Sequence, residues 1–254
     1  MHDTILEARN LTKDFRGFTA VSGLNLNVRR GDIHALIGPN GAGKTTCFNL
    51  LTKFLSPTSG KIFLNGADIT AATASQVACK GVVRSFQISA VFPELTVLEN
   101  VRIGLQRNLG TSFHFWKSTS SLRVLNDRAM QLLADVNMDT LADVPAADLP
   151  YGRKRALEIA TTLSLEPQLM LLDEPTQGMG HEDVYLVTQL IKKVSSGRTV
   201  LMVEHNMGVV SSICDRISVM QRGSMLAEGT YDDVSRNADV ISAYMGTEAR
   251  SLTA

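Results

Sequence analysis

The sequence predicts an α/β fold that begins with a β-rich region and carries a helical insertion in its middle. Apolar strand patterns alternate with helical patterns over most of the 254 residues, which is typical of this class. A glycine-rich turn between a buried strand and a helix also favours it. The chain is long enough for a substantial core, since proteins of this size hide roughly 70–75% of their unfolded surface.

The first third of the chain has strand patterns around one predicted helix. Leu24, Leu26 and Val28 alternate with polar residues, as expected for a strand with one buried face. Three further elements are expected here: a buried strand from Ile33 to Ile37, a helix from Lys44 to about Leu55 that stops ahead of Pro57, and a short strand from Lys61 to Leu64.

The middle of the chain, from Thr96 to about Leu165, has a helical pattern. The piece from Gln106 to Ser121, which contains Phe113, Phe115 and Trp116, is mostly polar and is predicted to be a loop. Strand patterns then return at Leu169–Leu172, Thr199–Val203 and Ile217–Met220, with a helix expected at Asp183–Val194.

Charge and cysteine content limit the function classes. Lys plus Arg and Asp plus Glu are each 25, so the formal charge is zero and a mainly electrostatic nucleic-acid binder is disfavoured. Cys47, Cys79 and Cys214 have no metal-ligand spacing and are predicted to be reduced thiols that fill apolar space in a cytoplasmic protein. No stretch approaches the ~18–20 apolar residues of a membrane span, so a membrane role would require docking onto another chain.

Residues Gly38 to Thr45 fit the P-loop pattern, in which Gly-Lys-Thr follows a glycine after four residues. The glycines allow successive backbone N–H groups to face one anion at the start of a helix. Lys44 is expected to reach the β- and γ-phosphates, and the Thr45 hydroxyl to ligate Mg²⁺. The predicted ATP-binding residues in this segment are Gly38, Asn40, Gly41, Gly43, Lys44, Thr45 and Thr46.

Two carboxylates at the end of a later strand supply the second half of such a site. The apolar run Leu169–Leu172 is followed directly by Asp173 and Glu174. We expect Asp173 to hold Mg²⁺, directly or through water, and Glu174 to polarise the attacking water as general base. Without a P-loop in the same chain, an ordinary pair of acidic residues in a surface turn would be the favoured explanation.

Four further features appear in an order that resembles the ABC ATPase family. They are Phe15 near the N-terminus, Gln87 in Arg84-Ser85-Phe86-Gln87, the segment Leu149-Pro150-Tyr151-Gly152-Arg153-Lys154-Arg155, and His205 in Val203-Glu204-His205. The resemblance extends from about Leu6 to Gly246. It implies a P-loop NTPase core of the ABC type, and a single ABC ATPase domain over residues 1–254. Residues of about 1–90 and 166–254 would form the RecA-like and β core, and about 91–165 a helical subdomain with the signature motif.

The resemblance also implies roles for these residues. Phe15 would stack on adenine, although Phe18 is a rival; Gln87 would contact the γ-phosphate and Mg²⁺; His205 would act with Lys44 and Glu174 in hydrolysis. Tyr151, Gly152 and Arg153, in the signature position, would face ATP bound by a second subunit.

Within the family the chain is similar to importers of the branched-chain amino acid (Liv) type. This similarity rests on Gly38-Pro39-Asn40-Gly41, on residues 81–87, on the Tyr-Gly signature, on residues 203–207, and on Ala243-Tyr244-Met245-Gly246. The implied cofactors are ATP and Mg²⁺. The implied partners are a second ABC ATPase, two integral-membrane permeases and, indirectly, a solute-binding protein, with no nucleic acid. The implied location is the cytoplasmic face of a bacterial inner membrane.

The cargo stays open between branched-chain amino acids, amides, urea and aromatic acids. The ATPase of an exporter or lipid extractor, or an ABC ATPase not linked to transport, is the alternative function. Two positions depart from the family pattern: Pro150 stands in place of the signature serine, and Gly180 where an acidic residue or Asn is usual. Both would serve the partner's ATP, so we expect a heterodimer with two unequal sites.

Overall fold

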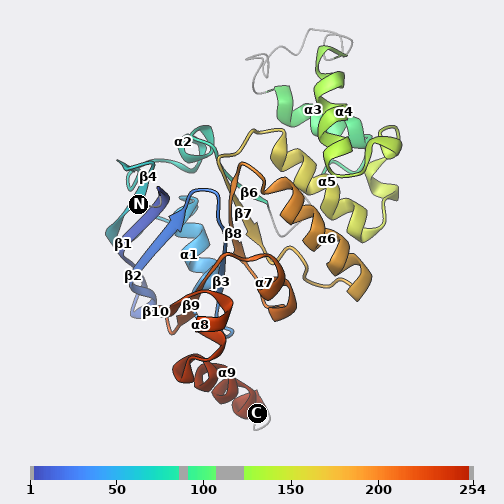
Figure 1. Ribbon diagram of the computed structural model, residues 1–254. Coiled ribbons are helices and arrows are strands. Elements are labelled where there is room, and N and C mark those ends of the chain that lie inside the picture. Colours follow the sequence, from blue (N-terminus) through green and yellow to red (C-terminus); the bar gives the residue numbers. More distant parts are fainter. Residues whose placement is uncertain (1–2, 86–90, 107–122, 252–254) are drawn as a thin grey trace.

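The computed structural model describes residues 3–85, 91–106 and 123–251, with side chains up to Tyr244. Its strands form two sheets, and its helices lie between them, over one face of the larger sheet, and in a separate group at one end (Figure 1). The strands are β1 (Thr4–Phe15), β2 (Phe18–Arg29), β3 (Ile33–Ile37), β4 (Ser59–Leu64), β5 (Ala67–Asp68), β6 (Val82–Ser85), β7 (Leu169–Asp173), β8 (Thr199–Val203), β9 (Arg216–Gln221) and β10 (Ser224–Gly229). The α-helices are α1 (Lys44–Leu51), α2 (Ala74–Cys79), α3 (Val97–Gln106), α4 (Asn126–Asp135), α5 (Tyr151–Leu163), α6 (His181–Val194), α7 (Met207–Ile213), α8 (Tyr231–Ser235) and α9 (Ala238–Ser251), and η3 (Asp139–Leu141) and η4 (Ala146–Asp148) are 3₁₀ turns.

The N-terminal sheet is antiparallel, with strand order β2-β1-β4-β5. β1 and β2 form a hairpin joined by Arg16 and Gly17, whose φ angles of 45° and 98° suit the tight turn between twisted strands. Leu24, Leu26 and Val28 of β2 are buried and alternate with exposed residues, so the predicted strand with one buried face is confirmed.

The larger sheet has the order β10-β9-β3-β8-β7-β6 and is parallel except for the β9–β10 pair. Its central strands β3, β7 and β8 are buried at every residue, which is why their sequences are mostly apolar. Side chains alternate between the two faces. Leu201 and Val203 pack with α1 and the N-terminal sheet, whereas Val200 and Met202 pack with the helices of the other face.

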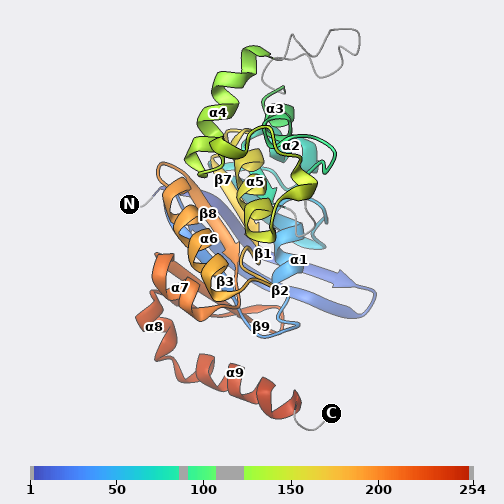
Figure 2. The same cartoon turned by 90° about the vertical axis from the view of Figure 1, so that its right-hand side faces the viewer.

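Helix α1 lies between the two sheets, and α3, α4 and α5 form the group at one end of the molecule (Figures 1 and 2). Helix α9 projects at the opposite end. The predicted helical pattern of the middle region is confirmed where it is described, since Ala129, Leu132 and Leu133 of α4 are buried on one face. In the described part of the chain, no helix is long and apolar enough to cross a membrane.

Two expectations were wrong in detail. The helix that starts at Lys44 ends at Leu51, because Lys53 adopts a left-handed φ of 62° well before Pro57. Cys47 is buried and Cys214 half-buried, but Cys79 is exposed at the end of α2, a helix that buries only Val77. The loop expected at Gln106–Ser121, with Phe113, Phe115 and Trp116, lies outside the described residues from 107 onward.

Candidate functional site: a phosphate loop facing a Glu–His pair

The loop from β3 to α1 is wound tightly against two neighbouring strands. Gly38 and Gly43 have φ angles of 149° and 100°. A Cβ atom on Gly38 would lie 2.2 Å from the carbonyl oxygen of Met220, and one on Gly43 would lie 2.5 Å from that of Ala20. Glycine is therefore required at both positions, for backbone conformation and for space.

Lys44 opens α1 and is buried. Its Nζ donates hydrogen bonds to the carbonyl oxygens of Gly38 at 2.7 Å and Pro39 at 3.1 Å. Burial lowers the pKa of Lys44, while the negative charges of Glu174 and Asp173 act in the opposite direction. The ammonium group thus lies near both carboxylates, at the positive end of a helix, where an anion is favoured.

The rest of the loop is open to ligands. Asn40, Gly41 and Thr45 are exposed, and Thr46 is half-buried. Phe15, at the end of β1, is 43% exposed with Nζ of Lys13 5.1 Å from its ring centroid. It pairs across the hairpin with Phe18, which is 67% exposed, so both aromatic candidates are available at the hairpin end.

Asp173 and Glu174 stand at the end of β7 but have different surroundings. Asp173 is buried and forms an ion pair with Arg84 of β6, which also donates a hydrogen bond of 2.6 Å to Oδ1 of Asn49 in α1. Glu174 has a left-handed φ of 48°, and its backbone N–H donates to the carbonyl of Val203 at 3.0 Å. This turn in the backbone separates the two carboxylates into a buried one and a partly exposed one.

The carboxylate of Glu174 is hydrogen-bonded to His205, with Oε1 2.9 Å from Nε2. An ionised carboxylate only accepts, so this contact places the proton on Nε2. Glu174 and His205 line a cleft of about 390 Å³ together with Asn40 of the phosphate loop and Gln177. Predicted residues from three distant parts of the sequence therefore meet in one cleft.

Helix α5 begins at Tyr151, directly after Pro150. The Tyr151 hydroxyl donates to the carbonyl of Gln177 at 3.2 Å, and Nη1 of Arg153 donates to the carbonyl of Asn137 at 2.9 Å. Gly152 packs on Asp183, since a Cβ there would lie 2.5 Å from Oδ1. The start of α5 thus adjoins the loop that follows Glu174. Gln87 lies outside the described residues.

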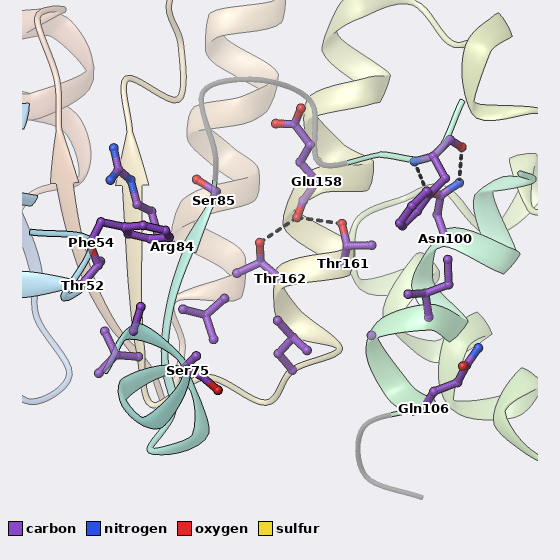
Figure 3. A pocket seen from close by; sticks show the side chains of 18 residues that line it. Thr52, Phe54, Ser75, Arg84, Ser85, Asn100, Gln106, Glu158, Thr161 and Thr162 are labelled. Carbon is purple, nitrogen blue, oxygen red and sulfur yellow. Dashed lines mark hydrogen bonds between the residues drawn. The ribbon is translucent and has the colours of Figure 1, made fainter. Parts of the chain in front are cut away.

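A second, larger cavity of about 660 Å³ lies between β6, α2, α3 and α5 (Figure 3). The exposed side chains of Phe54, Phe92 and Ile103 contribute to its lining. Asn100 fixes the backbone at Phe92, accepting a hydrogen bond of 2.7 Å from its N–H and donating one of 3.0 Å to its carbonyl (Figure 3). This cavity mixes apolar side chains with polar ones such as Arg84 and Glu158, and among the described residues it shares no lining residue with the cleft of Glu174 and His205.

The side chains predicted to bind a metal ion carry oxygen donors, which suit a hard cation. A threonine hydroxyl at Thr45 and a carboxylate at Asp173 supply oxygen, the ligand that Mg²⁺ prefers. Over residues 3–85, 91–106 and 123–251, no group of three or more His, Cys, Asp or Glu side chains could hold a metal by itself. Mg²⁺ usually takes one or two carboxylates plus phosphate oxygens, so such a sparse set fits a metal that arrives with a nucleotide.

Comparison with known proteins gives the family. Residues 21–177, more than half of the chain, match the ABC transporter family model. The chain belongs to the ABC transporter family. Residues 224–250 also match the model of the branched-chain amino acid ATP-binding cassette transporter.

The ABC relatives cover almost the whole chain. It is 41% identical to the high-affinity branched-chain amino acid transport ATP-binding protein BraF of Pseudomonas aeruginosa and 38% identical to LivG of Escherichia coli, over 97% of this chain and 99% of each relative. The ADP conformation of MJ1267, an ATP-binding cassette of an ABC transporter, is 30% identical with a TM-score of 0.84, over 96% of this chain and 99% of that one. The predicted α/β fold of the P-loop NTPase type is thereby confirmed, and the chain is an ATPase of the ABC type.

Three residues that contact the predicted site residues or their loops received no role in the sequence analysis. Arg84 pairs with Asp173, Glu204 accepts hydrogen bonds from the loops of Glu174 and His205, and Arg155 donates to the carbonyls of Glu174 and Pro175. For two of them a signal existed. Arg84 interrupts an apolar strand, and Glu204 follows one directly, where a charged residue must find partners if it is buried.

Proposed function

We propose that this ATPase powers uptake of branched-chain amino acids, or related small polar solutes, through partner permeases. The observation that carries the hydrolytic part is the Glu174–His205 hydrogen bond of 2.9 Å in the cleft shared with Asn40 of the phosphate loop. The importer assignment is supported by BraF and LivG, whose names specify branched-chain amino acid transport.

In this proposal the phosphate loop and Lys44 hold the triphosphate. Backbone N–H groups of residues 40–46 would surround the β-phosphate, and Lys44 would leave the carbonyls of Gly38 and Pro39 for the β- and γ-phosphates. Thr45 and Asp173, with Gln87, would hold Mg²⁺, which neutralises charge on the phosphate oxygens when bound. Phe15 would stack on the adenine.

Glu174 and His205 would act on the attacking water. Glu174 is placed to orient the water and accept its proton, and its left-handed backbone agrees with the strain often found at reacting residues. His205 would hold the Glu174 carboxylate through its Nε2–H in the ground state, and would redirect this N–H to the γ-phosphate in the transition state.

A second ABC ATPase subunit would complete the site. The start of α5, with Tyr151, Gly152 and Arg153, would face the nucleotide of the partner. Pro150 removes both a hydroxyl and a backbone N–H from this end of α5. We therefore propose a heterodimer with a related subunit and two unequal sites. Equal turnover at both sites, measured in assembled dimers with one site inactivated at a time, would refute it.

The 660 Å³ cavity is the proposed docking site for a cytoplasmic segment of the permease. It lies where a helical subdomain of about residues 91–165 would meet the core. Phe92 lines it and is followed in the sequence by Pro93 and Glu94. A lining that combines exposed apolar side chains with polar ones suits a short amphipathic helix. The chain would then work at the cytoplasmic face of the membrane.

Two measurements test the proposal. Lys44→Ala should abolish ATP hydrolysis, and Glu174→Gln should bind ATP yet hydrolyse it at least about a hundredfold more slowly; normal turnover in either would refute the assigned role. Affinity purification from detergent-solubilised membranes should recover two permeases and a second ATPase. Recovery of only nucleic-acid or ribosomal partners would overturn the transporter assignment and leave the ATPase chemistry intact.

A further inference from the structure

Glu204 is a buried carboxylate whose two oxygens accept four hydrogen bonds. It directly follows β8 and is 3% exposed. Oε1 accepts from the backbone N–H of Thr176 at 3.2 Å and from its hydroxyl at 2.5 Å. Oε2 accepts from the backbone N–H of His205 at 2.8 Å and of Asn206 at 3.0 Å. A carboxylate this buried is costly unless donors surround it, and these four donors satisfy it.

The two oxygens of Glu204 serve two different loops. Thr176 stands two residues after Glu174, in the loop that leaves β7. His205 and Asn206 start the loop that leaves β8, and Asn206 also caps α7 through its side chain. Glu204 therefore connects the loop that carries Glu174 to the loop that carries His205, and it lines the same cleft in which these two side chains meet.

We infer that Glu204 is a positioning residue for ATP hydrolysis, which holds these two loops in the register that places Nε2 of His205 2.9 Å from Oε1 of Glu174. The inference rests on the proposed roles of Glu174 and His205. His205 is 42% exposed, so its orientation depends on the loop beneath it more than on packing of its ring. Errors of about 1 Å in such a pair cost about a hundredfold in rate.

Neither conservative replacement reproduces this bridge. The amide of glutamine must turn its NH₂ group toward one of the two loops. In the loop of His205 this NH₂ group would face two backbone N–H donors, and in the loop of Thr176 it would face the Thr176 N–H, so in either orientation donor meets donor. Aspartate is one methylene shorter and cannot reach both loops from the same backbone position. Both variants keep a polar side chain, so they change the bridge more than the burial.

The test is a double-mutant cycle on this chain co-purified with its partner subunits, with steady-state ATP hydrolysis and binding of a fluorescent ATP analogue. Glu204→Gln should lower kcat by about 10- to 100-fold while the dissociation constant of the analogue changes by less than about threefold. In the His205→Ala background, Glu204→Gln should cost no more than about a further threefold, because the residue through which Glu204 acts is gone. Equal fractional losses in both backgrounds would overturn the inference, as would parallel loss of analogue binding.

Two further variants separate positioning from folding. Thr199→Val removes a buried hydroxyl that accepts the Gly31 N–H at 3.0 Å at the opposite end of β8, and should leave kcat unchanged. Thr176→Val removes the shortest donor to Glu204 and should lower kcat about tenfold, whereas Thr176→Ser should restore it. If Glu204→Gln does not fold, the two Thr176 variants, made also in the His205→Ala background, provide the same test. A loss of kcat in Thr176→Ser equal to that in Thr176→Val would refute the inference.

The outcome is distinguishable from failure of the proposed function. Wild-type turnover in Lys44→Ala and Glu174→Gln would remove the hydrolytic roles themselves. If those variants lose turnover, but Glu204→Gln lowers kcat by the same factor with and without His205, only the role of Glu204 would be removed.

Discussion

The guanidinium group of Arg155 in helix α5 donates hydrogen bonds of 3.0 Å to the backbone carbonyls of both Glu174 and Pro175. Its third contact is an ion pair of 2.5 Å with Glu158, one turn further along the same helix. Arg155 and Glu158 are both buried. The helix that opens at Tyr151 is therefore fixed to the backbone of the loop that carries Glu174, within one chain.

Arg155→Met should strongly destabilise the protein. The substitution leaves two carbonyls without their donor and the Glu158 carboxylate buried without a counter-charge, which costs about 3–5 kcal/mol. Urea unfolding measures this loss. The double variant Arg155→Met/Glu158→Met removes the orphaned charge and should recover part of the stability. A double variant as unstable as Arg155→Met would show that the buried ion pair is not the cause.

The Arg84–Asp173 pair gives a second stability prediction. Both side chains are almost fully buried, at 11% and 3% exposure, so Arg84→Met should cost about 3 kcal/mol or more by leaving Asp173 unpaired. Asn49→Ala removes only the neutral acceptor of the same guanidinium and should cost about 1–2 kcal/mol. Thermal unfolding without nucleotide compares them, and equal losses would contradict a dominant role for the charge pair.

Gly38→Ala should impair nucleotide binding. The new methyl group would lie 2.2 Å from the carbonyl oxygen of Met220, so either the loop or β9 must shift. We expect at least about a tenfold loss in affinity for a fluorescent ATP analogue, on the scale of about 1–3 kcal/mol for overpacking. Gly197→Ala is the matched control, because Gly197 also has a positive φ, 74°, but has open space around it. Unchanged affinity in Gly38→Ala would contradict the tight winding of the loop.

We expect mild acidification to lower the stability of the folded protein because of His34. This side chain is fully buried in β3, with Nε2 2.8 Å from the Ser218 hydroxyl. Burial lowers its pKa to about 4, outweighing Glu228, which raises it; Arg216 and Arg29 lower it further. The unfolded chain, with a histidine pKa near 6.5, therefore binds a proton that the folded chain refuses.

Stability should consequently rise with pH between about 4 and 6.5 and level off above that window. Urea unfolding should show about 1 kcal/mol less stability at pH 5.5 than at pH 7.5 from this group. His34→Gln should flatten the profile over that interval. An unchanged slope in His34→Gln would assign the acid sensitivity to other groups.

Local sequence patterns were sufficient to predict the strands in which every residue is buried. The predicted strand at Thr199–Val203 is β8, and the P-loop lies between β3 and α1 as expected, because apolar runs and glycine positions reflect local constraints. Strand β10 (Ser224–Gly229) was not predicted. Its residues are mostly half-buried, and it is a strand because it pairs with β9.

The site shows the same difference between residues identified by a local motif and residues that depend on distant partners. Lys44, Asp173, Glu174 and His205 were selected from motifs, and the structure brings Glu174 and His205 into contact; their chemical roles stay predictions. The residues that support them were not selected, because their partners are far away in sequence. Arg84 meets Asp173, and Arg155 reaches the carbonyl of Glu174, only after the chain has folded.

The turn between β9 and β10 affects the order in which the protein can mature on the ribosome. Gly223 in this turn donates its N–H to the carbonyl of Ala42 at 2.9 Å and accepts from the N–H of Ser22 at 2.8 Å. At ordinary synthesis rates, residue 223 is added roughly 10 to 40 seconds after residue 42. A nascent chain therefore makes its phosphate loop long before it makes the turn that supports it. A ligand stabilises only the state to which it binds, so we expect ATP to stabilise chains that include this turn more than shorter ones.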